Sequence, residues 1–219
     1  MVKRRRAEVK VSTLSTEQKR ELVEAKDKEL NTFVKYSVVE AASRQGIPPS
    51  ALMKMRWVVA FKDDGSLKAK LVVQGFTDQR LGKIPTSSPT ASRRSRQIFL
   101  TFAASLGFQT HKGDVKCAFL QGDLDEQHAD DNDDDDSQIE SAQPVSDTFC
   151  EPVPELSRKL QLEHHQCIRL LKAVYGLVNA PRRWYHRVAT DLRNMRGEES
   201  LMEPCLWTFR DENGVIHAL

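Results

Sequence analysis

The sequence predicts an α+β fold in which helices pack on an antiparallel sheet. Two kinds of segment support this prediction: stretches with apolar residues at helical spacing, and pairs of short apolar runs joined by tight turns. They alternate without the strand–helix–strand regularity that a parallel sheet requires. With 219 residues, of which 39% are hydrophobic, the chain is long enough to bury a substantial core.

The first predicted helix spans residues 16–34. Ser15 and Gln18 have the spacing of a capping box, in which each side chain pairs with the backbone N–H of the other residue. The apolar positions behind this cap follow helical spacing: Leu22, Ala25, Leu30 and Phe33.

A β-hairpin is predicted next. Its apolar runs, residues 57–61 and 71–73, flank Asp63-Asp64-Gly65, and an Asp-Gly pair supports the positive φ angles of a tight turn. The second strand carries Lys68 and Lys70, which are two residues apart and therefore lie on one face.

A second helix is predicted between Ser92, which can cap its start, and Gly107, which ends it. We expect four of its apolar positions to face a core: Ile98, Phe99, Phe102 and Leu106. Residues 108–114 are then predicted to form a strand, and residues 117–120 a short turn or helix.

The last third of the chain is predicted to contain a strand at residues 167–171, a helix and a hairpin. Pro181 suits the first turn of the helix, because its φ angle is fixed in the helical range. The final hairpin joins residues 206–209 to residues 215–216 across Asn213-Gly214, the strongest turn signal in the chain. Apolar residues recur every fourth position in the helix: Trp184, Val188 and Leu192.

Charge is distributed unevenly along the chain. The formal net charge is +2, from 33 Lys and Arg against 31 Asp and Glu, yet residues 127–155 hold ten acidic side chains and no Lys or Arg. Without that segment, 21 acidic residues oppose the 33 basic ones, a balance of +12. Such a basic body suits a polyanionic partner, although surface Lys and Arg also simply keep proteins in solution. Composition alone leaves both interpretations open.

Residues 127–147 are predicted to be an inserted, solvated loop. Six aspartates and one asparagine lie between Asp130 and Asp136, and a run of like charges repels itself. A calcium-binding loop is the alternative. The segment lacks the glycine and the terminal bidentate glutamate of an EF-hand.

The sequence indicates an intracellular protein, cytoplasmic or nuclear. It has no run of about 18 apolar residues that could span a membrane, and no apolar segment follows the basic N-terminus as in a secretory signal. The four cysteines lack Cys-x-x-Cys spacing and are interpreted as reduced thiols. The alternative is a zinc site, although the ligand spacing fits no structural zinc pattern; its ligands would be Cys150, His164, His165 and Cys167.

The order of several short motifs points to chemistry. The motifs follow one another in the order seen in the fingers and palm of a polymerase. First comes a basic hairpin, then Asp-Val-x-x-Ala-Phe at residues 114–119, then a strand leading to Tyr175-Gly176, and finally a helix begun by proline. Over residues 56–219 this order resembles the reverse transcriptase domain of copia-type LTR retrotransposon Pol polyproteins. The matching segments are residues 56–58, 68–76, 88–91, 114–122, 171–177, 180–184 and 203–207.

The resemblance implies a two-metal polymerase site. Asp114 would be the first metal-binding, catalytic carboxylate, with the backbone carbonyl of Val115 as an auxiliary ligand. Two Mg²⁺ ions would activate the primer 3′-hydroxyl and stabilise the leaving pyrophosphate. Lys68 and Lys70 would neutralise the incoming triphosphate, for which a lysine is adequate as a point charge.

Four further residues complete the nucleotide-binding set that the resemblance implies. Lys116 follows the metal-binding segment, and Phe119 occupies the position of a steric gate whose ring disfavours ribonucleotides. Tyr175 and Gly176 would pack beside the nascent base pair. The implied partners are an RNA or DNA template–primer, dNTPs and the rest of a Pol polyprotein, without a membrane.

The chain also departs from the family's pattern. Lys70 stands where the family usually has Arg, and Gln74 and Asn179 replace a usual basic residue and a usual Gln. The family's Tyr-x-Asp-Asp hairpin, which supplies the second and third carboxylates, is missing from the 219 residues. Because one carboxylate cannot hold two Mg²⁺ ions, we expect an incomplete metal site and no polymerisation by this chain alone. The alternative is a non-catalytic nucleic-acid-binding remnant of a transposable element.

The implied fold is a partial right-hand polymerase, with fingers and part of a palm, truncated before the Tyr-x-Asp-Asp motif. The predicted regions are a basic disordered tail (1–14), an N-terminal helix and lead-in (15–55), a fingers hairpin with the first palm strand (56–126), the acidic inserted loop (127–147), and a truncated continuation of palm and fingers (148–219).

Overall fold

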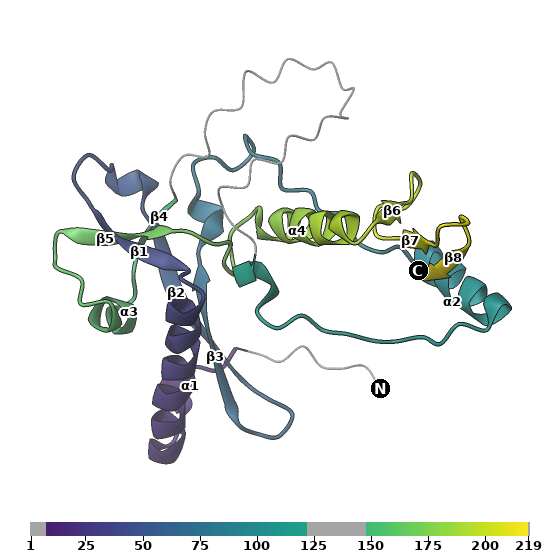
Figure 1. The fold of residues 1–219 in the computed structure, drawn as a ribbon. Coiled ribbons are helices and arrows are strands. Elements are labelled where there is room, and N and C mark those ends of the chain that lie inside the picture. The colour runs from purple at the N-terminus through teal and green to yellow at the C-terminus, as the bar shows by residue number, and fades with distance from the viewer. Residues whose placement is uncertain (1–7, 122–147, 219) are drawn as a thin grey trace.

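The computed structural model describes residues 8–121 and 148–218, which form two sheets and the helices around them (Figure 1). All neighbouring strands are antiparallel except β2 and β4. The prediction of a mixed helix-and-strand fold dominated by antiparallel pairing is therefore confirmed. The larger sheet has the order β1 (Val39–Ser43), β5 (Gln166–Leu170), β4 (Phe149–Glu151), β2 (Met53–Phe61), β3 (Leu67–Val73); the smaller has the order β6 (Gly197–Glu199), β7 (Trp207–Arg210), β8 (Ile216–Ala218).

Within the described residues, four α-helices and four 3₁₀ turns accompany the sheets. In Figure 1, α1 lies along β3, and α4 leads from the larger sheet toward the smaller one, beside which α2 lies. The helices are α1 (Thr16–Lys35), α2 (Arg93–Leu106), α3 (Pro154–Lys159) and α4 (Ala180–Asn194), and the 3₁₀ turns are η1 (Val11–Thr13), η2 (Pro49–Ala51), η3 (Gly75–Thr77) and η4 (Ala118–Gln121).

The first helix begins as predicted. The Ser15 hydroxyl accepts a hydrogen bond from the Gln18 backbone N–H at 3.2 Å, and the Gln18 side chain accepts one from the Ser15 N–H at 3.0 Å. The helix also covers the edge strand β3. Glu21 accepts a hydrogen bond from the backbone N–H of Leu67, and Glu29 accepts one from that of Leu71. These contacts satisfy backbone donors that an edge strand leaves unpaired.

The predicted hairpin is confirmed as β2 and β3. Trp57 pairs with Leu71, and the turn passes through Gly65 at a φ of 82°. Along β3 the side chains alternate, with Lys68 and Lys70 on the face opposite the buried one. The buried face consists of Leu67, Ala69, Leu71 and Val73.

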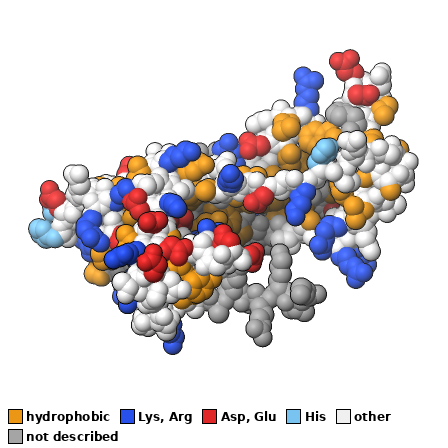
Figure 2. Space-filling model, turned by 90° about the horizontal axis from the view of Figure 1, so that it is seen from below, with side chains coloured by type: hydrophobic (Ala, Val, Ile, Leu, Met, Phe, Trp, Pro, Cys, Tyr) orange, Lys and Arg blue, Asp and Glu red, His pale blue; other side chains and the backbone are white. Residues whose placement is uncertain are grey.

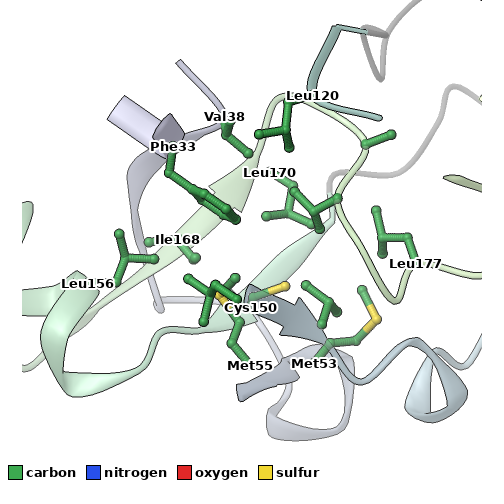
Figure 3. Close-up of a cluster of buried hydrophobic side chains, with 14 of the residues drawn as sticks. Phe33, Val38, Met53, Met55, Leu120, Cys150, Leu156, Ile168, Leu170 and Leu177 are labelled. Atoms are coloured by element: carbon green, nitrogen blue, oxygen red, sulfur yellow. The ribbon is translucent and has the colours of Figure 1, made fainter. Parts of the chain in front are cut away.

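The main core lies where α1, the larger sheet and α3 meet (Figure 3). Phe33 of α1, Leu156 of α3 and Ile168 of β5 are almost entirely buried there. Leu120 of η4 and Leu177, which follows Tyr175-Gly176, reach the same cluster. Two segments that carry predicted site residues are therefore anchored in one core.

The prediction of a disordered tail over residues 1–14 is wrong for residues 8–14. The Val9 N–H donates to the Val59 carbonyl at 2.8 Å, and Leu14 is buried in a small cluster on the hairpin. Glu8 pairs with Arg56 at 2.6 Å. The apolar Val9 and Leu14 therefore outweigh the basic, polar composition of this segment.

The predicted strand at residues 108–114 is not a strand. This segment runs from α2 to η4 without pairing to any strand of the described residues. A strand needs a partner for its backbone hydrogen bonds, and alternating apolar residues cannot supply one.

The second helix forms between Ser92 and Gly107 as predicted, but its packing was predicted wrongly. Ile98 is 51% exposed and Leu106 is 50% exposed, while the residues of α2 that are buried are Ser95 and Ala103. Phe99 and Phe102 are half-buried. Periodicity identified the helix correctly and misplaced its buried face.

The remaining predicted elements are confirmed. They are β5, α4 with Pro181 in its first turn, and the hairpin of β7 and β8, in which Gly214 has a φ of 76°. The sequence interpretation did not include β1, β4, β6 or α3.

Candidate functional site

The candidate site is built around the end of β3. The Val73 N–H donates a hydrogen bond to the Tyr175 carbonyl at 2.8 Å. Gly176 has a φ of 94°, and a Cβ there would lie 1.9 Å from the Val73 carbonyl oxygen. A Cβ on Gly75 would lie 2.2 Å from the Gly176 carbonyl oxygen. Both glycines are therefore required by the close approach of two backbone segments.

Lys70, Tyr175 and Phe119 form one chain of contacts across this junction. The Lys70 Nζ lies 3.4 Å from the centroid of the Tyr175 ring, in a cation–π contact. The Tyr175 and Phe119 rings meet edge to face, with centroids 5.0 Å apart and an interplanar angle of 72°. Three of the predicted nucleotide-binding residues are thus adjacent in space, although they are far apart in the sequence.

The η4 turn that carries Phe119 is fixed at several points. Leu120 is buried, and its N–H donates to the Cys117 carbonyl at 2.9 Å. The Gln121 side chain donates to the Lys116 carbonyl at 2.8 Å, and Arg187 of α4 donates to the Gln121 carbonyl at 3.4 Å. The Phe119 ring therefore projects from an anchored segment.

The predicted metal-binding residues lie on the extended segment just before η4. Asp114 and Lys116 are exposed, and Val115 is 48% exposed. Within residues 8–121 and 148–218, Asp114 makes no hydrogen bond or ion pair. In the same part of the chain, no group of three or more His, Cys, Asp or Glu could hold a metal ion.

Glu29 brings a negative charge near the two lysines of β3. Burial raises its pKa, whereas the hydrogen bond from Leu71 and the positive charges of Lys70 and Lys68 act in the opposite direction. The sequence interpretation missed this residue, because its position in the middle of α1 gives no signal of contact with β3.

Other motif segments contact one another in ways that the sequence did not reveal. The Ser88 hydroxyl donates to the Pro181 carbonyl at 3.0 Å, which ties the loop before α2 to the start of α4. Glu203 accepts hydrogen bonds from the hydroxyls of Ser92 at 2.9 Å and Ser95 at 2.6 Å. The Ser95 hydrogen bond, followed by that of Ser92, lowers the pKa of Glu203. These contacts tie the start of α2 and the loop before it to two later motif segments.

A cavity of about 360 Å³ lies elsewhere, beside the connection between β1 and β2. In its wall, the Arg80 guanidinium pairs with the buried Asp78 carboxylate at 2.8 Å and donates to the Thr148 hydroxyl at 3.1 Å. None of the predicted site residues lines this cavity.

Surface charge is mixed on the face shown in Figure 2, where basic side chains occur along the length of the molecule with acidic ones among them. This face is not a continuous basic surface.

The metal-binding alternatives have different outcomes. For the zinc site, Cys150 and Cys167 are buried in β4 and β5, and burial raises the pKa of both thiols. A buried thiol with a raised pKa is a poor source of the thiolate that zinc requires. The acidic insert, and with it the calcium loop, lies outside the described residues.

Comparison with known proteins gives a consistent family. Residues 36–132 match the family described as reverse transcriptase (RNA-dependent DNA polymerase). The chain is 30% identical over 214 residues to the retrovirus-related Pol polyprotein from transposon TNT 1-94 of Nicotiana tabacum. This alignment covers 93% of this chain and 14% of that polyprotein. It is also 30% identical over 179 residues to the retrovirus-related Pol polyprotein from transposon RE2 of Arabidopsis thaliana. That alignment covers 78% of this chain and 11% of the RE2 polyprotein.

The chain therefore spans only a small part of the polyproteins that it matches. No solved structure matches it. In the part of the chain that the structure describes, none of the helices has both the length and the apolar character needed to cross a membrane.

Proposed function

We propose that this chain, which belongs to the reverse transcriptase family of retrotransposon Pol polyproteins, is the part of a copia-type RNA-directed DNA polymerase that holds a dNTP against a template–primer. The observation that carries the proposal is the contact chain from Lys70 through Tyr175 to Phe119. It places a cation for phosphate beside two aromatic rings that can pack on a base and a sugar. The partial right-hand fold, with fingers and part of a palm, belongs to the same proposal.

In this proposal the lysines bind phosphate, and the aromatic residues contact the sugar and the base. Lys68 and Lys70 neutralise the triphosphate from one face of β3, and Lys116 adds positive charge beside η4. The Phe119 ring lies against the sugar and disfavours a 2′-hydroxyl. Tyr175 and Gly176 pack beside the new base pair, on a turn whose backbone is fixed to β3.

Magnesium chemistry is only partly provided for. Asp114, with the Val115 carbonyl, fits one ligand position of a two-metal site. When its ions are bound, such a site activates the primer hydroxyl. The described residues do not group further carboxylates into such a site. We therefore assign no step to the metal in this chain.

We propose that the isolated 219-residue chain does not extend a primer. Primer extension with dNTPs and Mg²⁺ or Mn²⁺ should yield no product above a protein-free control, because the described residues bring only Asp114 to a site that must hold two ions. The Asp114→Asn variant serves as the matched control. Incorporation by the unmodified chain that Asp114→Asn abolishes would show that this proposal is wrong.

Template–primer binding tests the wider proposal. The double substitution Lys68→Met with Lys70→Met should weaken binding of a template–primer with a 5′ overhang about tenfold or more, because two phosphate-binding charges are lost. Fluorescence anisotropy with a labelled primer measures this. The control variant carries Lys19→Met with Lys28→Met. It removes two exposed lysines of α1 and changes the net charge by the same amount. Equal losses of affinity in both variants would contradict a local site.

The second candidate function is that of a non-catalytic, nucleic-acid-binding remnant of a transposable element. The exposed, unpaired position of Asp114 among the described residues favours it. In that case Asp114→Asn leaves binding unchanged with and without Mg²⁺. A loss of binding confined to Mg²⁺-containing buffer would favour the polymerase-derived site instead.

A further inference from the structure

We propose that Tyr175 is a positioning residue for Lys70: the face of its ring holds the lysine ammonium in the place where a nucleotide triphosphate meets it. This inference rests on the proposed function for its ligand. It assigns to Tyr175 a task distinct from packing on a base pair, and it makes phosphate binding depend on an aromatic side chain that need not touch phosphate.

The first observation is how close the contact is. The Lys70 Nζ lies 3.4 Å from the Tyr175 ring centroid. The other cation–π pairs of the described residues, such as Lys26 over Trp57 and Arg193 over Trp207, have separations of 5.1 Å and 5.5 Å. Attraction between a cation and a ring face strengthens as the two approach. Lys70 is therefore held more closely than these other cations.

The second observation is that the Tyr175 ring and its backbone make several contacts besides the one with Lys70. The Tyr175 ring meets the Phe119 ring edge to face. The Tyr175 carbonyl accepts the hydrogen bond from Val73, and the backbone at Gly176 lies so close to β3 that a Cβ there would be 1.9 Å from the Val73 carbonyl oxygen. Leu177 is buried just beyond Gly176. The ring therefore projects from a backbone that is tied to β3 and the core, and its edge-to-face contact with Phe119 also restrains it.

The chemical reason lies in the nature of lysine. Its ammonium is a point charge on a flexible stem of four carbons, without the planar fork that orients an arginine. Ordering such a side chain on binding costs conformational entropy. A ring that already restrains it reduces that cost. The ring covers one side of the ammonium and leaves N–H groups free to donate to phosphate oxygens.

A spectroscopic test addresses the contact itself. In the 219-residue chain, the Lys70 ε-methylene protons should be shifted upfield by the ring current of Tyr175, whereas those of Lys68 should resemble a free lysine. Tyr175→Phe should keep the upfield shift, and Tyr175→Leu should remove it. A Lys70 signal that is the same in the Leu variant as in the unmodified chain would overturn the inference, whether or not the protein binds nucleotide.

A binding test addresses the consequence. Tyr175→Leu should lower the affinity for dATP with Mg²⁺ about fivefold, while Tyr175→Phe stays within about twofold of the unmodified chain. In a Lys70→Met background, Tyr175→Leu should lower the affinity for dATP less than it does in the unmodified chain, because the part of the loss that acts through the lysine is already gone. An equal loss in both backgrounds would show a merely structural role and overturn the inference.

The two proposals fail in distinguishable ways. If the unmodified chain binds dATP no better than the variant that carries Lys68→Met and Lys70→Met, the proposed function is wrong at this site. The positioning of Lys70 as a phosphate ligand then falls with it, even where the spectroscopic signature of the ring contact is present. If dATP binds and depends on Lys70 but not on Tyr175, only the inference is wrong.

Discussion

Replacing Gly176 with alanine is expected to destabilise the protein by about 3 kcal/mol or more. The new Cβ would lie 1.9 Å from the Val73 carbonyl oxygen and 3.0 Å from its carbon, both of which belong to the backbone of β3. An alanine at a φ of 94° would also be strained. The turn must therefore move away from β3, and the Tyr175 ring must move with it. Urea denaturation followed by circular dichroism measures the loss.

Gly65→Ala is the matched control for this substitution. Gly65 has a φ of 82°, also in the left-handed region, but a Cβ there would meet nothing within 4 Å. The Gly65→Ala substitution should lower the free energy of unfolding by only about 1 kcal/mol, from backbone strain alone. Equal losses of stability in Gly176→Ala and Gly65→Ala would mean that the close approach of the turn to β3 does not contribute to stability.

Phe33→Ala should lower the free energy of unfolding by about 3–5 kcal/mol. The Phe33 side chain is 1% exposed and lies in the main core, where α1 meets the larger sheet. Its removal leaves a cavity that the neighbouring side chains fill only in part. A loss of this size is a large fraction of the 5–15 kcal/mol typical of a folded domain. Thermal unfolding should therefore shift well below that of the unmodified chain.

Val34→Ala provides the comparison on the same helix. Val34 is 50% exposed and should change stability by no more than about 0.5 kcal/mol. A small effect at Phe33, or equal effects at both positions, would contradict the location of the core.

Sequence patterns predicted the elements whose signals are local. The capping box of Ser15 and Gln18, the Asp-Gly turn at Gly65 and the Asn-Gly turn at Gly214 each determine a few neighbouring dihedral angles. These signals need no distant partner. The structure accordingly contains a helix or hairpin at each of the three places.

The failures concern contacts between distant segments. Residues 108–114 have a strand-like pattern but no partner strand in the described residues. Ile98 and Leu106 follow helical spacing, yet the described chain does not bury them. Val9 and Leu14 pack on the hairpin within a segment that composition predicted to be disordered. Periodicity indicates which residues could be buried, and the tertiary partner decides which are.

The candidate site shows the same division. Motif order indicated Lys70, Phe119 and Tyr175 one by one, but nothing in the sequence indicated that one ring carries the lysine and touches the other ring. Gly75 and Gly176 lie within the matching motif segments, and the physical reason for a glycine at each position appears only where the turn meets β3. Spacing along a chain cannot report an approach of two backbones.

The salt dependence of template–primer binding tests the central claim most directly. The claim is that the lysines of β3 contact the phosphates of nucleic acid and nucleotide. Removing Lys68 and Lys70 together should make the negative slope of log affinity against log salt concentration shallower by about 2, while removing Lys19 and Lys28 of α1 should leave it unchanged. An unchanged slope in the β3 variant, or an equal decrease in both variants, would contradict the account.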